Sequence, residues 1–260
     1  MEVINQHRSI RKYSNKEISN DLLKKLVEEA ERTQTMGNLQ LYSVVITRTE
    51  EMKKKLAPLH FNQPMVESAQ AVVTICADFN RTVRWCEERK AQPGYDNELS
   101  FINAATDALL FTQTFSILCE EQGIGLCFLG TTVYQPDKII DVLKLPKLTF
   151  PVATLTLGYP DESPTQSDRL PVEAIIHEET YKDYSKQDID KLYAPKESLP
   201  ENKDFVRINN KETLAQVFTD LRYTRKDNEA MSETLKATLK RQGFIKRAIW
   251  RTKKAIKRHH

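Results

Sequence analysis

The feature that most constrains the fold is a long apolar stretch, FINAATDALLFTQTFSILCEEQGIG, at residues 101–125. It is long enough for a helix of about five to six turns, with apolar residues around much of its circumference. A helix of this kind belongs in a protein core or at a subunit interface, because a largely apolar surface is unfavourable in water. Gly123 and Gly125 at its end suit a left-handed helix cap.

Shorter apolar segments on both sides of this stretch alternate between strand and helix patterns. Amphipathic helices are predicted at residues 19–33, capped by Ser19 or Asn20, and at 136–145, which opens with proline. Strand patterns occupy residues 41–47, 69–79, 126–132 and 150–160. The 69–79 run is continuously apolar, as expected when both faces of a strand are covered.

This alternation indicates an α/β or α+β protein built on one central sheet. Residues 163–210 are polar and contain several prolines, which suggests an excursion over the surface, and residues 211–243 look helical again. The predicted division is a core at residues 1–185, an excursion with helices at 186–243 that packs on the core or on a partner, and a basic amphipathic tail at 244–260.

Composition excludes several classes of protein. Hydrophobic residues make up 40% of the 260 residues and charged residues 29%, as in a globular protein. The sequence has no run of about 18 apolar residues and no secretory leader pattern, so we expect a cytoplasmic protein without a membrane span. The four cysteines form no CxxC pair, so we expect them to be reduced, and we expect no metal site.

Charge is distributed unevenly along the chain. Residues 240–260 hold nine Lys and Arg and no acidic residue, which leaves 30 Lys and Arg against 36 Asp and Glu elsewhere, a net charge of −6. Two interpretations of this tail are open. A basic amphipathic helix can lie weakly on an anionic membrane, and it can equally be a solvated helix. We expect no nucleic-acid partner.

The opening segment HRSIRKYSNKEI places potential cations around a hydroxyl before any apolar segment begins. Arg8, Ser9 and Arg11 supply bidentate and hydroxyl donors, which are suited to a phosphate monoester. The alternative is a solvated basic segment before a helix. Arg169, in SDRLP, is a further cation that follows the last predicted strand.

Other polar positions occur in loops next to predicted strands. Gly37 permits close backbone approach, and the amides of Asn38 and Gln40 follow it, although either amide can equally be a turn residue. FLGTT offers backbone N–H groups near a helix start, and Gln63 precedes a strand. GxGxxG, GxxxxGK[ST] and GxSxG are all missing, so neither a Rossmann site, a P-loop nor a serine-hydrolase site is indicated.

Five segments together resemble the nitroreductase family of FMN-dependent NAD(P)H oxidoreductases. In chain order they are HRSIRKYSNKEIS, GNLQLYSVVI, FNQPMVESAQAVVTICADFNR, EEQGIGLCFLGTT and LTLGYPDESPTQSDRLP. The ADFNR and LGYPxxxP…RLP elements are similar to the subgroup of oxygen-insensitive nitroreductases and NADPH–flavin oxidoreductases. The likeness covers residues 5–181, and more loosely extends to residue 244. It implies an α+β homodimer with a central mixed sheet flanked by helices and the long helix at the interface.

The resemblance also assigns residues to FMN. Those implied for its phosphate are Arg8, Ser9 and Arg169. Those implied for the ribityl chain and ring edge are His7 and Arg11. Those implied for the isoalloxazine ring are Gln63, Leu129, Gly130 and Thr131. Those implied to reach the cofactor from the partner subunit are Gly37, Asn38 and Gln40.

The implied reaction transfers electrons from NAD(P)H through the flavin to a nitroaromatic, quinone or flavin acceptor, with the two substrates bound in turn. Arg11 would stabilise the charge of the reduced ring, and no catalytic acid or base is expected. A flavin-binding redox sensor, or a membrane-associated flavoprotein without general nitroreductase turnover, is the alternative.

Two departures from the subgroup bear on binding. Ser167 stands where a lysine is usual, which removes one positive charge near the cofactor. The segment that reads the 2′-phosphate of NADPH aligns poorly, so the preference between NADPH and NADH stays open. The candidates for this phosphate are Arg207, Arg222, Arg225 and Lys226.

Overall fold

The computed structural model describes residues 2–245. Within this range the chain forms two compact units. One, called here the sheet unit, consists of residues 9–162 and 233–245. The other, called here the helical unit, consists of residues 2–8 and 163–232. The division predicted at residues 185 and 243 stays a prediction. The tail predicted for residues 244–260 lies outside the described residues except for residues 244 and 245.

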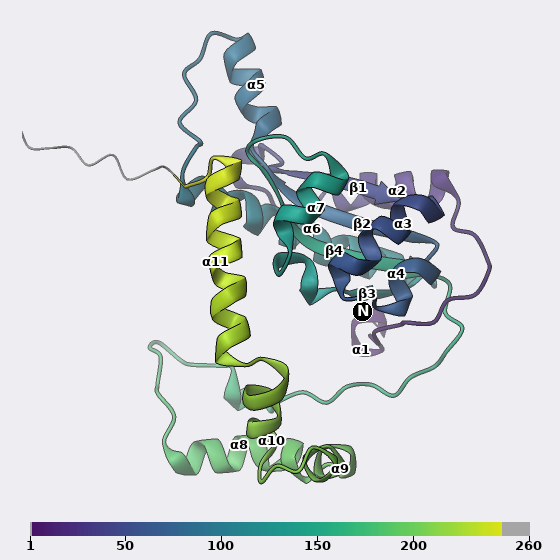
Figure 1. Ribbon diagram of the computed structural model, residues 1–260, viewed down its shortest axis with the longest axis vertical. Helices are drawn as coiled ribbons and strands as arrows, with labels where there is room; N and C mark the ends of the chain where they lie inside the picture. Colours follow the sequence, from purple (N-terminus) through teal and green to yellow (C-terminus); the bar gives the residue numbers. More distant parts are fainter. Residues whose placement is uncertain (1, 246–260) are drawn as a thin grey trace, which may run out of the picture. The chain divides into compact units, whose positions relative to one another are not determined.

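The sheet unit is built on one four-stranded sheet in the order β1-β2-β4-β3 (Figure 1). The strands are β1 (Tyr42–Thr47), β2 (Ala71–Asp78), β3 (Gly125–Phe128) and β4 (Thr149–Gly158). Every residue of β2 is buried, as its continuous apolar run predicts. The sheet with its helices confirms the α+β class.

Every strand pair in the described sheet is antiparallel, whereas the family resemblance implied a mixed sheet. The connection between β2 and β3 explains this difference. It passes through a long helix, α6 (Glu98–Glu121), and returns β3 in the same direction as β2. β4 then lies between these two strands and runs against both, as in the pairs Val73 with Leu155 and Leu126 with Leu157.

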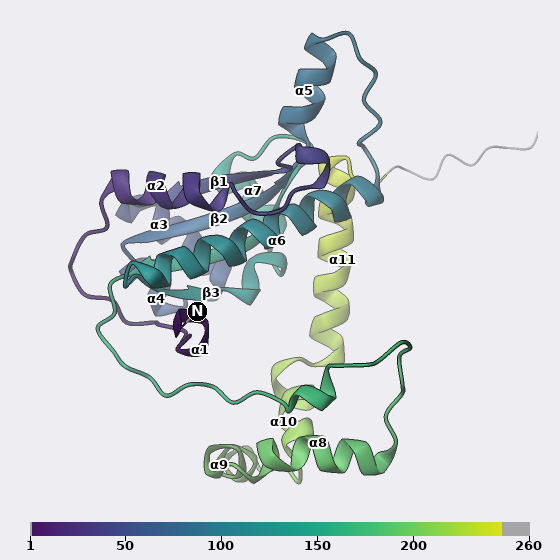
Figure 2. The ribbon, with the colours of Figure 1, turned by 180° about the vertical axis from the view of Figure 1, so that it is seen from behind.

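Helices cover both faces of this sheet, and α6 lies along one of them beside α2 (Asn20–Ala30), as Figure 2 shows. The Ser19 hydroxyl caps α2 by accepting from the Leu22 N–H at 3.1 Å. The opposite face carries α3 (Glu50–Leu56), α4 (Pro64–Ser68) and α7 (Pro136–Leu143). Neighbouring side chains of β2 therefore enter different cores: Val73 packs with the α6 cluster and Val72 with the α3–α4–α7 cluster.

The long helix α6 buries one face and leaves an apolar face uncovered by described residues. Its buried side chains against the sheet are Ala104, Ala108, Phe111, Phe115 and Cys119. Its outward apolar side chains include Leu99 and Ile102, which are 70% and 58% exposed, and also Leu109 and Leu110. The Asn97 side chain caps its start by accepting from the Ser100 N–H. The sequence prediction of a core helix is thus confirmed for one face.

Several short elements complete the sheet unit. The sequence did not predict α3, α4 or α5 (Asn80–Glu88), because these helices are short and their apolar stripes are brief. The short helical turns are η1 (Met36–Asn38), η2 (Ala57–His60) and η3 (Gly130–Val133).

The helical unit contains two helices in the segment that the sequence suggested to be a surface excursion. They are α8 (Lys186–Ser198) and α9 (Pro200–Ile208). Ser185 and Asp188 form a capping box that starts α8, and Pro200 occupies the first turn of α9. Because the surrounding segment is polar, these two helix-start signals were not recognised in the sequence. The remaining elements are α1 (Glu2–Asn5), η4 (Val172–Ala174), α10 (Leu214–Val217), η5 (Phe218–Arg222) and the start of α11 (Arg225–Gln242).

Across residues 2–245, no helix is both long enough and apolar enough to cross a membrane.

Two paired glycines let the segment after Ser9 lie against the sheet. Gly125 and Gly158 face each other across β3 and β4. A Cβ at Gly125 would lie 2.7 Å from Ile10 Cγ1, and one at Gly158 would lie 2.6 Å from the ring of Tyr13. The backbone of this segment is bonded to the strands and their extension, since Ile10 N–H donates to the Leu126 carbonyl and Ser14 N–H to the Tyr159 carbonyl.

We expect Gly158→Ala to lower the free energy of unfolding by about 1–3 kcal/mol, because the new methyl group overlaps the Tyr13 ring. The Tyr13 hydroxyl is bonded to the Ile10 carbonyl at 2.8 Å and to Thr156 Oγ1 at 2.7 Å, so the ring cannot move aside freely. Gly94→Ala is the matched control, since its methyl group would meet no atom within 4 Å. Urea denaturation of both variants tests this, and equal stabilities would contradict it.

Candidate functional site

The loop that carries Gly37, Asn38 and Gln40 is fixed by one buried carboxylate on α6. Asp107 is 2% exposed and accepts from the Thr35 hydroxyl at 2.5 Å, the Met36 N–H at 2.9 Å and the Leu41 N–H at 3.1 Å. The Thr35 hydroxyl oxygen in turn accepts from the Gln40 N–H at 2.8 Å. A buried charge is tolerated here because its oxygens are bonded to several donors.

The three predicted residues of this loop all have left-handed backbone conformations. Their φ angles are +55° at Gly37, +56° at Asn38 and +51° at Gln40. Such conformations are strained for residues other than glycine, so the surrounding contacts must impose them. The Asp107 bonds do so from one side, and Arg81 of α5 donates to the Gln40 carbonyl from another. These contacts therefore hold the backbone that carries the Asn38 and Gln40 amides in one conformation.

We expect Asp107→Asn to lower the free energy of unfolding by about 1.5–3 kcal/mol, the range for hydrogen bonds to a charged group. The new amide nitrogen would face backbone N–H donors that need an acceptor. Glu121→Gln, at the exposed end of the same helix, is the control and should change stability by less than about 0.5 kcal/mol. Thermal and chemical denaturation provide the comparison, and equal losses in the two variants would show that the carboxylate does not anchor the loop.

Ser9 and Arg11 lie on the segment that packs against the sheet at Gly125 and Gly158. Glu162 holds the backbone of this segment, because its Oε1 accepts from the Arg11 N–H at 2.5 Å and the Lys12 N–H at 3.0 Å. These bonds lower the pKa of Glu162. The Arg11 guanidinium lies beside the buried Cys127 thiol, whose pKa is raised by burial and partly lowered again by Arg11. The Arg11 side chain is exposed.

Arg8, His7 and Arg169 belong to the helical unit. Gln166 connects their segments, since its amide nitrogen donates to the Asn5 carbonyl at 2.6 Å and the His7 carbonyl at 3.2 Å. The exposed Arg169 side chain donates to the carbonyls of Ser167 and Asp168. Arg8 is exposed, and its guanidinium makes no hydrogen bond or ion pair with another residue of the described chain.

Gln63 and Thr131 come together around a residue that the sequence analysis did not select, His60. His60 is completely buried, and its Nδ1 lies 2.8 Å from Thr131 Oγ1. The Gln63 amide nitrogen lies 3.1 Å from the His60 carbonyl oxygen and 3.5 Å from Thr131 Oγ1. Burial lowers the pKa of His60 to about 4, so the imidazole is neutral at pH 7. Two residues with left-handed backbone conformations, Phe61 and Asn62, follow His60 directly, and no local sequence pattern marked it.

The backbone donors predicted at Leu129, Gly130 and Thr131 differ in availability. The Leu129 N–H donates to the Thr154 carbonyl at 2.8 Å and so belongs to the sheet. The next two N–H groups open η3, where a first turn has no carbonyl partner within its own helix. They are the donors of this segment that can reach a ligand.

The four candidates for a 2′-phosphate lie in the helical unit, and three already have partners. Arg207 forms an ion pair with Asp204 at 3.0 Å, and Arg225 forms one with Glu229 at 3.5 Å. The Arg222 guanidinium lies over the Phe205 ring at 4.4 Å. These contacts are exposed and weak enough to exchange for a phosphate. Lys226 makes no ion pair with any other residue in the described range.

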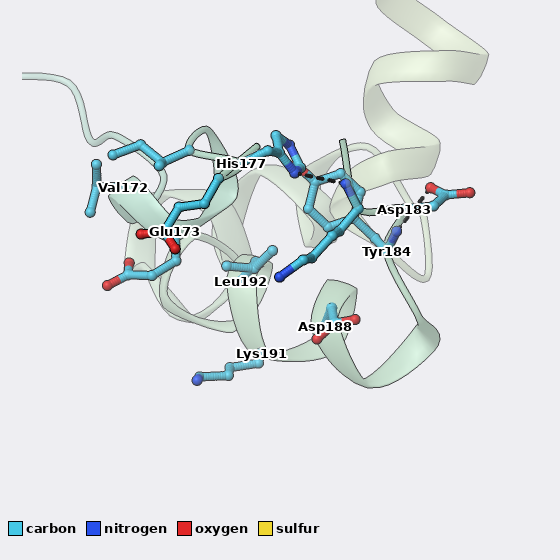
Figure 3. Close-up of a pocket in the computed structure, with 11 residues that line it drawn as sticks. Val172, Glu173, His177, Asp183, Tyr184, Asp188, Lys191 and Leu192 are labelled. Carbon is cyan, nitrogen blue, oxygen red and sulfur yellow. Dashed lines mark hydrogen bonds between the residues drawn. The ribbon is translucent and has the colours of Figure 1, made fainter. Parts of the chain in front are cut away.

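The helical unit also has a surface hollow of about 560 Å³, shown in Figure 3. Tyr184 hydroxyl and His177 Nε2 lie 3.2 Å apart in its wall, and Glu173, Asp188 and Lys191 surround it. No residue predicted from the sequence as part of a site lines this hollow. Within residues 2–245, no cluster of three His, Cys, Asp or Glu could hold a metal ion.

Comparison with known proteins identifies the family of this chain. The model of the nitroreductase family matches residues 4–159. FMN reductase (NADPH) of Bacillus subtilis (strain 168) is 32% identical over 183 residues, covering 70% of this chain and 74% of the relative.

Two solved structures are similar over nearly the whole chain. A Bacteroides fragilis NCTC 9343 protein, provisionally assigned as an oxidoreductase, is 59% identical with a TM-score of 0.93, covering 95% of this chain and 100% of that one. The NfrA1 nitroreductase of B. subtilis is 27% identical with a TM-score of 0.82, covering 94% of this chain and 98% of that one.

Proposed function

The chain belongs to the nitroreductase family, and from this premise we propose that it is an FMN-dependent oxidoreductase that passes electrons from NAD(P)H to small acceptors. The observation that carries the proposal is that Gln63 and Thr131 lie together beside the buried His60. Both residues fall within the segment that matches the family, residues 4–159. The relative named FMN reductase (NADPH) supports FMN as the cofactor and NADPH as the donor. The four cysteines are free thiols, which agrees with a cytoplasmic enzyme.

The donor groups of the sheet unit fit FMN. The Thr131 hydroxyl, the Gln63 amide and the N–H groups of Gly130 and Thr131 offer directional bonds to the edge of a planar heteroaromatic ring. Ser9 and Arg11, on a segment fixed by Glu162, offer a hydroxyl and a cation. For the phosphate we propose the residues that the family resemblance implies, Arg8, Ser9 and Arg169. The guanidinium groups of Arg8 and Arg169 are not engaged by acidic residues in the described chain.

In the proposed mechanism FMN supplies the hydride and electron chemistry when bound. The chain's own residues bind and orient. Arg11 presents a permanent positive charge, which favours a ring that gains negative charge on reduction. We propose that His7 and Ser9, both half-buried, orient the ribityl and phosphate end, as the family resemblance implies. We propose that NAD(P)H and an acceptor, a nitroaromatic, a quinone or free flavin, use the same place in turn, which gives ping-pong kinetics.

We expect the purified protein to show the visible absorption of oxidised flavin. Under anaerobic conditions NADPH should bleach this absorption, and a quinone added afterwards should restore it. Turnover with parallel double-reciprocal plots would support alternating use of one site. Bleaching without quinone reduction would favour a flavin-binding sensor, and release of FAD rather than FMN on heating would contradict the cofactor assignment.

We expect Arg8→Ala and Arg169→Ala each to weaken FMN binding by about 1.5–3 kcal/mol, because each removes a charge-assisted hydrogen bond to phosphate. Arg89→Ala is the matched control, since that exposed guanidinium donates to the neighbouring Glu88 carbonyl. Titration of apoprotein with FMN, followed by flavin fluorescence, measures the effect. Unchanged affinity in both variants would remove these arginines from the proposed site.

We propose that the protein is a homodimer, supported by the uncovered apolar face of α6. The exposed side chains of Leu99, Ile102, Leu109 and Leu110 lie on one side of the helix. Sedimentation should give twice the 30.1 kDa mass of one chain. Ile102→Glu should shift this toward monomer, and Lys24→Glu on the exposed side of α2 should not. A wild-type monomer with full FMN content would contradict the dimer and the partner role of Gly37, Asn38 and Gln40.

A further inference from the structure

The buried, neutral ring of His60 determines which atom donates in each hydrogen bond around it. Nε2 is buried and has no partner within the described residues, while Nδ1 lies 2.8 Å from Thr131 Oγ1. A neutral imidazole carries one proton. On Nε2 that proton would be an unpaired buried donor, which folded proteins rarely contain. On Nδ1 it is donated to Thr131, so Nδ1–H is the favoured tautomer.

This tautomer determines the direction of the Thr131 hydroxyl. Its oxygen accepts from His60 Nδ1–H at 2.8 Å and, more weakly, from the Gln63 amide nitrogen at 3.5 Å. With both lone pairs engaged, the hydroxyl can only donate its own proton, and it must donate away from His60. Thr131 is half-buried at the start of η3, so this donor is accessible to a ligand.

The same bonds orient Gln63. Its amide nitrogen faces the His60 carbonyl at 3.1 Å and Thr131. The Gln63 carbonyl oxygen, Oε1, therefore remains as the acceptor for a ligand, beside a hydroxyl that donates. A donor next to an acceptor matches an imide edge, in which a ring N–H adjoins a ring carbonyl, and the isoalloxazine of FMN has such an edge at N3–H and its flanking carbonyls.

We propose that His60 is a positioning residue that fixes the orientation of the Thr131 hydroxyl and of the Gln63 amide. The Thr131 hydroxyl then donates to a carbonyl of the FMN ring, and Gln63 Oε1 accepts from the N3–H of that ring. The proposal rests on the proposed function. It assigns a role to a residue that does not itself touch the cofactor, because His60 is completely buried behind Thr131 and Gln63.

A double-mutant cycle on FMN affinity tests this role. His60→Leu removes the donor to Thr131, and Thr131→Val removes the hydroxyl while keeping the shape of the side chain. We expect each change to weaken FMN binding by roughly 5- to 30-fold, as for the loss of one hydrogen bond. The double variant should bind no more weakly than the weaker single variant, because both changes act on the same bond. His60→Asn, whose amide nitrogen can take the place of Nδ1, and Thr131→Ser should stay within about threefold of wild type.

A second measurement uses N3-methyl FMN, which lacks the N3–H. Wild type should prefer FMN over this analogue by about tenfold, and His60→Leu should lose most of that preference. Additive losses in the cycle, or wild-type discrimination in a folded His60→Leu variant, would overturn the role of His60. Should His60→Leu fail to fold, wild-type FMN affinity in Thr131→Val would overturn it equally. A wild-type protein that binds no FMN would instead overturn the proposed function, so the two failures are distinguishable.

Discussion

The packing of α6 on the sheet is the constraint on which the rest of the sheet unit depends. Phe111 and Phe115 fill the space against β2 and β4, and this burial stabilises both the helix and the strands. The same helix places Asp107 where the loop after α2 must turn. One element thus supplies the core, a polar anchor for the Gly37–Gln40 loop and an uncovered apolar face. The proposed dimer would use that third surface.

The close approach at Gly125 and Gly158 is the second condition for the site. Ile10 and Tyr13 occupy the space that two Cβ atoms would fill, and Glu162 bonds the backbone of Arg11 and Lys12. The structure thus accounts for part of the pattern in which cations precede the first apolar segment. No core segment precedes Ser9 and Arg11, yet the sheet holds their backbone in one place. This reduces the conformational entropy that the segment would lose on binding a ligand.

Buried polar groups do more of the positioning than exposed ones. Asp107 and His60 are almost fully buried, and each holds residues selected from the sequence for binding: Gly37, Asn38 and Gln40 in one case, Gln63 and Thr131 in the other. Exposed ion pairs such as Arg207 with Asp204 contribute little by comparison. A site supported from within in this way is rigid, because an alternative arrangement would leave a buried donor or acceptor without a partner.

The sequence by itself determined the main strands, the helices α2, α6 and α7, the family, and the residue types suited to FMN, because these follow from periodicity and local motifs. It did not determine the fully antiparallel sheet, since the place of β4 between β2 and β3 is a matter of chain topology. It missed α8 and α9, whose caps were hidden in a polar segment. Nor could it select Asp107 or His60. The groups that donate to Asp107 lie 66 to 72 residues away along the chain, and Thr131 lies 71 residues from His60. Only the tertiary structure brings such distant groups together, and their roles depend on burial, which no local pattern encodes.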